Sequence, residues 1–397
     1  MALFKSKVDG KGLAEFAQRL VQIPSLSGQE GDLAKALAAE LDAVGCDDVR
    51  IDELGNVVCR LGTGDGPILL LEGHMDTVDV SNPDSWERPP FGGDISAGVL
   101  YGRGAADMKG GLAAMTYALK ALASAKAELR GTCYLVGVVQ EEPCEGMAIQ
   151  HVLETNALRP DWVVLGEPTN LQIARGHRGR IALEITVRGR ASHASMPDQG
   201  VNAIYQAARV VVGVELLAAQ LGEDSFLGRG SIAVTDIRST AGSRNAVPDA
   251  CTLYLDRRLT GGETEAKAIA ELRSIVSREG VDASIRVDAY QGTTYTGAEV
   301  QARQEYAAWV TPANHPLVTA ASTVVERTLG YLPRVTRWDF STDGVYTAGV
   351  AGLPTIGFGP GEERYAHTSQ EQVKVRDLQA AAQVYVELAK RLIGGNA

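Results

Sequence analysis

Apolar residues follow two different periods along the chain, and the first of them is helical. Leu33, Leu37 and Leu41 are spaced by four residues, which places them on one face of a helix. Ser27 and Glu30 precede this stripe at the spacing of a capping box, in which each side chain hydrogen-bonds to the backbone of the other. We therefore predict a helix that begins just after Glu30.

Short runs of consecutive apolar residues follow, separated by helical stretches. The runs at 67–71, 133–139 and 162–165 have the length of strands, and residues 111–122 have an alanine-rich helical pattern. Strands that are apolar on both faces are typical of parallel sheets with helices packed on both sides. This order predicts an α/β domain with a mostly parallel sheet, to which the later run at 354–358 also belongs.

The pattern changes near residue 178, where alternating, half-exposed strands replace the buried ones. We predict a strand, a helix, two strands, a helix and a strand, at residues 180–187, 202–221, 231–238, 251–258, 264–278 and 283–289. The order β-α-β-β-α-β is typical of a small α+β domain of the ferredoxin-like kind. We therefore expect a catalytic domain made of residues 1–177 and 293–397, with a second domain inserted at 178–292.

Composition and charge exclude several classes of protein. Acidic residues outnumber basic ones by 49 to 38, and the net charge of −11 offers no general attraction to nucleic acids or anionic membranes. No run of about 18 apolar residues is present, and the N-terminal segment MALFKSKVDGKG lacks the apolar core of a signal peptide. The 5 cysteines are not spaced in pairs, which favours a reducing compartment. We expect a cytoplasmic protein that binds neither nucleic acid nor membrane.

Residues able to bind metal follow the predicted strands. His74 and Asp76 come directly after the run at 67–71, and residues two apart on an extended chain point the same way. They form either a metal ligand with its orienting carboxylate or a simple His–Asp pair at the start of a loop. Asp107 stands in the glycine-rich segment YGRGAADMKGG, either as a ligand that bridges two metals or as the N-cap of the next helix. The segment lacks the third glycine of a dinucleotide-binding loop.

Four further candidates stand in similar positions. Glu141 and Glu142 end the second buried strand, Glu167 follows the third, and His367 comes shortly after the last. Two adjacent glutamates by themselves are more typical of a solvated turn. Because ligands bind at the carboxyl ends of strands in open α/β sheets, we expect these side chains to meet at one edge.

Five of these residues together suit a centre of two metal ions: His74, Asp107, Glu142, Glu167 and His367. Three carboxylates and one hydroxide balance the charge of two divalent cations. Two ions about 3.5–4 Å apart can share that hydroxide, since metal binding lowers the pKa of water to about 7. Glu141 beside them would take the proton as general base and pass it to a leaving amine. The pattern predicts a hydrolase of amide bonds.

The motifs GHMDTV, GRGAADMKGG, EEPCEG, GEPT, SHASMPDQGVNAI and the final AH resemble metallopeptidase family twenty. That family includes acetylornithine deacetylase, succinyl-diaminopimelate desuccinylase, aminoacylase and glutamate carboxypeptidases. The segments GHRGR, LDRRLTGGET, RWDFSTDGV and IGFGPGEE are similar to a branch of hydrolases linked to selenium metabolism. The motifs span most of the chain in the family's order.

The resemblance implies a role for each candidate ligand. His74 and Glu167 would hold one zinc ion, Glu142 and His367 the other, and Asp107 would bridge them, with cobalt or manganese as alternative metals. Asp76 would orient His74, and Glu141 would act as general base and then as acid. The resemblance also implies a cis peptide bond between Asp107 and Met108.

The resemblance assigns further residues to substrate binding and to a dimer. His193 would reach the active site of a partner subunit and stabilise the oxyanion of the transition state, or else it is a surface histidine. Substrate carboxylates would be held by Arg178, Asn245, Arg258, Ser341 and Thr342. The arginines suit a carboxylate, but could equally form structural ion pairs. We expect a homodimer through the inserted domain, which would act as a lid.

The candidate residues and the resemblance lead to one principal expectation about function. The glutamate at position 167 favours deacylases over peptidases within the family, and Cys144 is interpreted as a small buried side chain. We expect a zinc hydrolase of small N-acyl amino acids, with a bridging hydroxide and Glu141 as base. The alternatives are a dipeptidase or carboxypeptidase with the same metal chemistry, a hydrolase of N-carbamoyl (ureido) amino acids, and a non-catalytic binding protein of the same fold.

Overall fold

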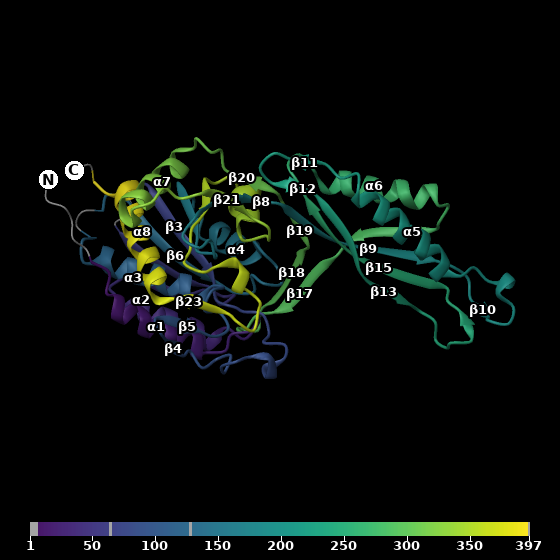
Figure 1. Cartoon of the computed structure of the whole chain (residues 1–397), viewed down its shortest axis with the longest axis horizontal. Helices are drawn as coiled ribbons and strands as arrows, with labels where there is room; N and C mark the ends of the chain where they lie inside the picture. Colours follow the sequence, from purple (N-terminus) through teal and green to yellow (C-terminus); the bar gives the residue numbers. More distant parts are fainter. Residues whose placement is uncertain (1–6, 63–65, 127–128, 396–397) are drawn as a thin grey trace.

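The computed structural model describes residues 7–62, 66–126 and 129–395. The first six residues of the N-terminal segment, on which the signal-peptide prediction partly depends, lie outside the described residues. Two domains lie side by side, the larger formed by both ends of the chain and the smaller by its middle (Figure 1). The predicted α/β catalytic domain with an inserted α+β domain is confirmed.

The larger domain is built on a sheet of nine strands in the described part of the chain. In spatial order these are β1 (Asp48–Ile51), β2 (Val57–Gly62), β6 (Thr132–Val138), β3 (Ile68–His74), β7 (Trp162–Leu165), β22 (Thr355–Gly357), β8 (Ile173–His177) and β20 (Trp309–Val310), with β21 (Val335–Trp338) also paired to β8. The central strands from β6 to β22 are parallel, and the flanking pairs are antiparallel except for β21 with β8. These central parallel strands are buried along almost their whole length, as their continuous apolar runs indicate.

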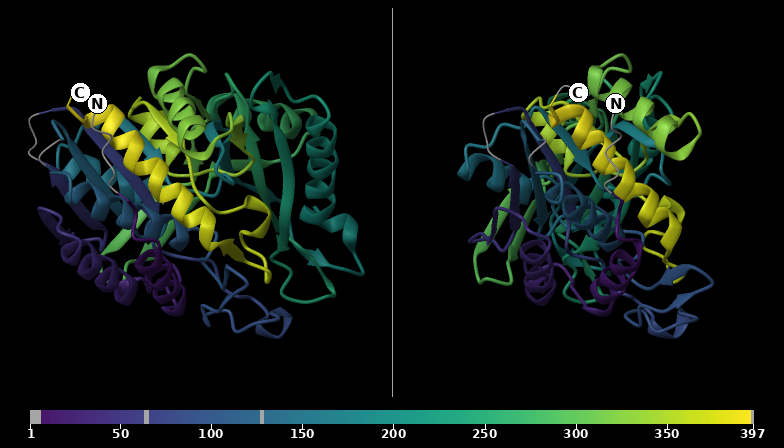
Figure 2. Two further views of the ribbon diagram at one scale, coloured as in Figure 1. Left: turned by 60° about the vertical axis from the view of Figure 1, so that its left-hand side comes forward. Right: turned by 90° about the vertical axis from the view of Figure 1, so that its left-hand side faces the viewer.

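Helices cover this sheet and fix the loops that leave it. Their bounds are α1 (Gly10–Gln22), α2 (Gly31–Ala43), α3 (Lys109–Ala123), α4 (Met147–Thr155), α7 (Pro316–Leu329) and α8 (Val375–Ile393). The last helix, α8, packs beside α3 and α7, so the two ends of the chain complete one core (Figure 2). A Cβ atom on Gly111 of α3 would lie 2.6 Å from the carbonyl oxygen of Gly166. The glycines after Asp107 thus allow this helix to approach the strand ends closely.

The smaller domain has the predicted β-α-β-β-α-β order. Its elements are β9 (Gly179–Arg188), α5 (Ala203–Ala218), β13 (Ser231–Ser239), β15 (Ala250–Leu259), α6 (Glu265–Arg278) and β16 (Ala283–Val287). The strands form an antiparallel sheet in the order β13-β15-β9-β16, and buried residues alternate with partly exposed ones along β15. Its own apolar core lies between this sheet and the two helices.

The second sheet extends further along the chain than the predicted boundary at residue 292. Strand β19 (Glu305–Tyr306) pairs with β9 just beyond β16, so two strands, β16 and β19, lie one after the other along the same edge of β9. Between them the chain forms a hairpin of β17 (Ala289–Thr293) and β18 (Glu299–Arg303). The polar alternation of this hairpin gave no apolar run from which its place could be predicted.

The β17–β18 hairpin leaves the second domain and docks on the catalytic domain. The hydroxyl of Tyr290 donates a hydrogen bond to Oε1 of Gln140 at 2.9 Å, and Nε2 of Gln140 donates to the carbonyl of Thr293 at 2.9 Å. The hydroxyl of Tyr295 donates to the carbonyl of Gly55 at 2.9 Å. The hairpin therefore connects the second domain directly to the residue that precedes Glu141.

The predicted capping box is wrong. Helix α2 begins at Gly31, and Glu30 caps it without a hydrogen bond from its side chain. Glu30 instead accepts hydrogen bonds from the backbone N–H groups of Gly28 and Gln140, and Ser27 donates to the carboxylate of Asp76. Both side chains bind the loop that carries the candidate site because that loop lies directly against the N-terminus of α2.

The remaining elements are short. They are β4 (Ile95–Ser96), β5 (Val99–Tyr101), β23 (Gln372–Lys374), β10 (Ser192–His193), β14 (Ala246–Val247), β11 (Glu223–Asp224) and β12 (Gly228–Arg229), with short helical turns at Pro83–Ser85, Pro197–Gln199, Val345–Val350 and Glu363–Tyr365. Among the described residues, no helix has both the length and the apolar character needed to cross a membrane.

Candidate metal centre

The predicted ligands meet beyond the carboxyl ends of the central strands. His74 is the last residue of β3, and its Nε2 lies 3.0 Å from Oδ1 of Asp107. The same nitrogen lies 3.7 Å from Oε1 of Glu167, which follows β7 after one intervening glycine. One imidazole and two carboxylates thus form the first group of donors.

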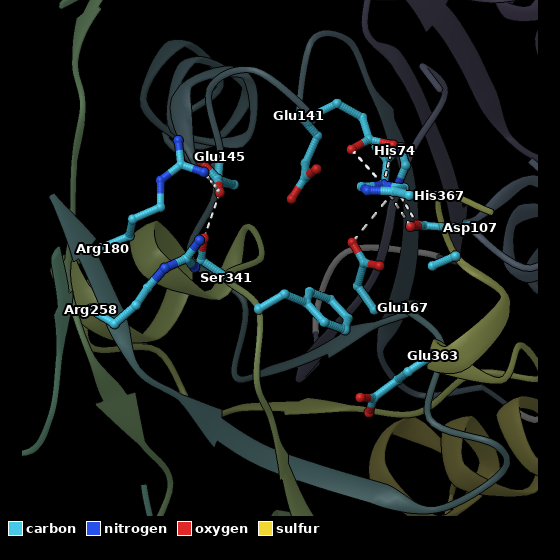
Figure 3. Close-up of a pocket in the computed structure, with 13 residues that line it drawn as sticks. His74, Asp107, Glu141, Glu145, Glu167, Arg180, Arg258, Ser341, Glu363 and His367 are labelled. Atoms are coloured by element: carbon cyan, nitrogen blue, oxygen red, sulfur yellow. Dashed lines mark hydrogen bonds and ion pairs between the residues drawn. The ribbon is translucent and has the colours of Figure 1, made fainter. Parts of the chain in front are cut away.

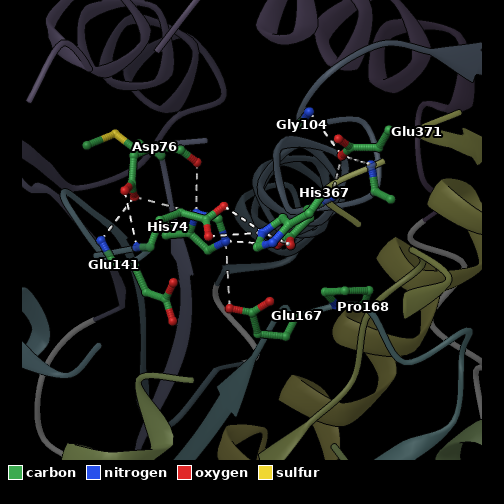
Figure 4. Close-up of polar contacts among 12 residues, drawn as sticks. His74, Asp76, Gly104, Glu141, Glu167, Pro168, His367 and Glu371 are labelled. Carbon is green, nitrogen blue, oxygen red and sulfur yellow. Dashed lines mark hydrogen bonds and ion pairs between the residues drawn. The ribbon is translucent and has the colours of Figure 1, made fainter. Parts of the chain in front are cut away.

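A second group shares the same aspartate. Nε2 of His367 lies 3.0 Å from Oε2 of Glu142 and 3.3 Å from Oδ2 of Asp107. Asp107 therefore presents one oxygen to each imidazole and stands between the two groups. Figure 4 shows the rings of His74 and His367 close together, with Glu167 linked to His74. Its alternative role as a helix cap is wrong, since α3 starts at Lys109 with Met108 at its N-cap position and no side-chain cap.

Neighbouring residues hold these ligands in place. Nδ1 of His74 lies 2.9 Å from the backbone oxygen of Asp76 and 3.5 Å from its Oδ1, so Asp76 orients the imidazole with both groups. The Asp76 carboxylate also accepts hydrogen bonds from the backbone N–H groups of Glu141 and Glu142. The loop from Gly104 to Asp107 is held by the buried carboxylate of Glu371, which accepts three of its backbone N–H groups. The peptide bond between Asp107 and Met108 is cis, as predicted.

The electrostatics of the cluster favour a bound cation. Burial raises the pKa of Glu141, Glu142 and Glu167 above that of an ordinary glutamate. Burial also opposes ionisation of Asp107, but hydrogen bonds with His367 and His74 outweigh it and leave its pKa below the usual range. Within the described residues, the ion pairs of the predicted carboxylate ligands all involve these two imidazoles.

The donor set fits divalent metal ions. Two triads of residues each bring their donor atoms within 4.8 Å of one another. One is His74 with Glu141 and Glu167, and the other is His74 with Asp107 and Glu142. Imidazole and carboxylate are ligands that zinc, cobalt and manganese all accept. A cation here would compensate carboxylates that burial otherwise penalises.

The cluster lines one side of a cavity of about 390 Å³ (Figure 3). The opposite side carries Arg180, Arg258, Glu145 and Ser341. Nη1 of Arg180 lies 3.3 Å from Oε1 of Glu145, and the Ser341 hydroxyl donates to the same oxygen. Glu141 also lines the cavity, so a molecule inside it meets the candidate base and the metal ligands together.

Other predicted substrate residues lie outside the cavity as the described residues define it. Arg178 donates to the carbonyl of Arg229 at 2.8 Å and lies 3.9 Å from Asp339. Thr342 is buried, and its backbone N–H donates to Nε2 of His177 at 3.1 Å. Burial lowers the pKa of His177 to about 4, so this histidine is neutral and structural.

Strand β10, which contains His193, lies at the outer end of the second domain (Figure 1), and it pairs with β14, which directly follows Asn245. The backbone N–H of Ala194 donates to the carbonyl of Asn245 at 2.8 Å, and the ring of His193 accepts a hydrogen bond from Ser195. His193 is exposed. Within one chain, neither residue lines the cavity that the described residues form.

Five cavity residues were not predicted: Glu145, Arg180, Phe340, Glu363 and Ala366. The motif GHRGR places two arginines two positions apart, and no pattern in it distinguishes the second one as the arginine that faces the cavity. Glu145 lies in EEPCEG beside the predicted glutamates, where an acidic turn gives no distinct signal. Cys144 is buried and does not belong to the cavity lining among the described residues, as interpreted from the sequence.

Residues 70–391 match the model of the peptidase family M20/M25/M40. The chain belongs to this family. Its members hydrolyse amide bonds with bound metal, and the geometry above is that of a metal-dependent amide hydrolase. The protein is 35% identical to the uncharacterized protein YgeY of Escherichia coli strain K12, over 98% of this chain and 96% of that protein.

Two further comparisons extend the family match. Succinyl-diaminopimelate desuccinylase of Alkalilimnicola ehrlichii is 27% identical over 96% of this chain and 99% of that enzyme. The structure of the Bacillus subtilis YXEP protein, described as a dinuclear metal-binding peptidase from the M20 family, superposes with a TM-score of 0.68 at 17% identity, covering 97% of this chain and 98% of that one. The latter similarity establishes the common fold.

Proposed function

We propose that this M20 enzyme hydrolyses the amide bond of small N-acyl amino acids with two zinc ions. The observation that carries the proposal is Asp107, which offers one carboxylate oxygen to each of two imidazole–carboxylate groups. His74 and Glu167 would hold one ion, and Glu142 and His367 the other. Zinc bound there supplies Lewis acidity and a water molecule of lowered pKa.

The chain's own residues would handle the proton. Glu141 is buried at the cavity wall, and its backbone N–H is fixed by Asp76 at 3.1 Å. Its carboxylate would take a proton from the attacking water and return it to the leaving nitrogen. The buried position, which disfavours a lone charge, suits a group that is protonated for part of the cycle.

Two features support a small acyl amino acid as substrate. The cavity of about 390 Å³ admits a small molecule rather than a folded polypeptide. Arg258 lines it from the second domain and would bind a carboxylate. The relative named succinyl-diaminopimelate desuccinylase is consistent with this class of substrate.

We also propose a homodimer through the second domain. Tyr205, Val212 and Leu216 expose apolar side chains on one face of α5. Strand β13 forms an edge of the adjoining sheet as the described residues build it, and it exposes Ile237. A second copy on this surface would cover both. His193 and Asn245, at the outer end of the same domain, would then serve the partner's cavity. Free thiols at all cysteines support a reducing, cytoplasmic location.

The direct test is release of primary amine by zinc-loaded protein, with and without a chelator. The panel should contain N-acetyl, N-succinyl and N-carbamoyl amino acids beside simple dipeptides. Chelator-sensitive release from an N-acyl class is the expected result. Release from dipeptides alone would replace the proposal with a peptidase, and release from N-carbamoyl compounds alone with a ureido hydrolase.

A further inference from the structure

The cavity wall that faces the metal ligands is built by both domains. Arg180 comes from the start of β9 and Arg258 from β15, whereas Glu145 and Ser341 come from loops of the catalytic domain (Figure 3). Arg180 and the Ser341 hydroxyl both bind the same oxygen of Glu145. We call these four residues the Arg180–Glu145 wall.

One carboxylate oxygen of Glu145 has no hydrogen-bond partner in the described part of the chain. The residue is 7% exposed, and its Oε2 has no hydrogen-bond partner among the described residues, although Oε1 accepts a hydrogen bond from Ser341 and forms an ion pair with Arg180. Buried polar atoms in native proteins are normally paired, and Glu145 lines the cavity, so its unpaired carboxylate oxygen suits a donor supplied by a molecule bound there. A cationic donor suits it best, since charge-assisted hydrogen bonds are the stronger ones.

The arginines of the wall provide the opposite charge. Arg258 uses Nε and Nη2 to bind its neighbour Asp256, at 2.7 and 3.2 Å. Nε of Arg180 is also without a hydrogen-bond partner in the described chain. Two guanidinium groups therefore line the wall together with the Glu145 carboxylate, and Asp256, which lies outside the cavity lining, pairs with Arg258. The wall thus presents both positive and negative groups. Such a combination favours a ligand group that carries both charges over a net anion or cation.

We propose that the Arg180–Glu145 wall binds the head group of a free α-amino acid. The ligand's ammonium would donate to Oε2 of Glu145, and its carboxylate would accept from Arg180 and Arg258. The substrate would then be an amide in the side chain of an amino acid whose α-amino and α-carboxylate groups are both free. This inference rests on the proposed amide hydrolysis and narrows its substrate class.

The test uses binding of three matched amines to the zinc-loaded protein, measured by calorimetry. L-Ornithine carries both head-group charges, 5-aminopentanoate lacks the α-ammonium, and putrescine lacks the carboxylate. Each charge that meets its partner should strengthen binding at least about tenfold, so ornithine should bind most tightly. Equal binding of ornithine and 5-aminopentanoate would overturn the proposal.

Variants assign each charge to its residue. Glu145→Gln should remove the preference for ornithine over 5-aminopentanoate. Arg180→Met should remove the preference for ornithine over putrescine. Glu363→Gln removes a different carboxylate from the same cavity and should keep both preferences. An unchanged ratio in Glu145→Gln, with zinc content as in the wild type, would also overturn the proposal.

A milder variant is available at Ser341. If Glu145→Gln loses its zinc or its fold, Ser341→Ala offers a milder variant, because it removes one donor that fixes Glu145. It should weaken ornithine more than 5-aminopentanoate, and the opposite result counts against the inference. Because these measurements require no turnover, head-group binding can fail while amide hydrolysis is observed, and the reverse outcome is equally visible.

Discussion

The two domains contribute to one cavity in different ways. The catalytic domain supplies the candidate ligands and Glu141 from loops at the ends of buried strands, and backbone hydrogen bonds fix their positions. The second domain supplies Arg180 and Arg258 to the same cavity, but carries His193 and Asn245 at its far end. The candidate metal ligands and Glu141 therefore all come from one chain's catalytic domain, whereas the outer end of the second domain lies away from that chain's own cavity.

The largest effect is expected from Glu141→Gln. The substitution keeps the size of the side chain and removes its ability to accept a proton, so kcat should fall by about 10²–10⁴-fold or more. The metal content, measured by atomic absorption, should stay at the wild-type level because His74, Asp107, Glu142, Glu167 and His367 remain. Substantial activity in this variant would exclude Glu141 as the base.

A smaller but distinctive effect is expected from His193→Ala. If this residue stabilises the transition state in a partner subunit, kcat should fall by about 10²–10³-fold with KM nearly unchanged. Mixing this variant with Glu141→Gln should restore activity, since a hybrid dimer has one site with both residues intact. Random exchange of subunits predicts recovery of about a quarter of the wild-type activity.

The mixing experiment has a built-in control. Each inactive variant mixed with itself must remain inactive, and size-exclusion chromatography must show dimers in all samples. Failure of the mixture to regain activity, although the subunits exchange, would show that His193 does not serve the partner's site.

The junction between the domains should show a pH effect. His177, the last residue of β8, is neutral with a pKa of about 4 in the folded protein, against an ordinary value of 6.5. The unfolded chain binds more protons below pH 6.5, so stability should fall as pH drops from about 6.5 to 4. Lowering the pH from 8 to 5 should therefore reduce the free energy of unfolding by about 2 kcal/mol through this histidine.

Urea unfolding of the zinc-loaded protein at several pH values provides the measurement. His177→Gln lacks the titrating group. Its free energy of unfolding should therefore fall by about 2 kcal/mol less than that of the wild type between pH 8 and pH 5. Parallel pH profiles for the two proteins would contradict a buried neutral histidine at this position.

The smallest effect is expected from Tyr290→Phe in the β17–β18 hairpin. The variant removes one hydrogen bond to Gln140, the residue before Glu141, and so loosens the position of the base. Loss of about 1 kcal/mol corresponds to a fivefold lower kcat. Tyr295→Phe is the matched control, since its hydroxyl binds Gly55 elsewhere in the catalytic domain. Equal kcat losses in the two variants would show that the hairpin acts only on stability.

Much of the fold and of the grouping of candidate metal ligands could be predicted because both follow from local patterns. Strand β7 has the predicted bounds, and the buried strands were recognisable by their continuous apolar runs. Each candidate ligand comes at or shortly after one of these strands or in the glycine-rich loop. Parallel strands bring their ends to one edge, and so distant residues such as His74 and His367 meet.

What could not be predicted depends on how the two domains face each other. Whether Arg178 or Arg180 enters the cavity is decided by the path of the chain at the crossing into β9. Glu145 belongs to the site only because Arg180 and Ser341 approach it from elsewhere. The β17–β18 hairpin has no apolar run, and its hydrogen bonds to Gln140 depend on the docking of whole domains.

The hairpin also gives the molecule a thermodynamic link between distant surfaces. Rotation of the second domain about its two chain crossings would pull on Gln140 unless the chain bends at the base of the hairpin. A partner that binds the second domain preferentially at one angle would therefore be energetically coupled to the position of Glu141. Linkage is reciprocal, so a ligand that fixes Glu141 must change the affinity of whatever covers α5 by the same factor.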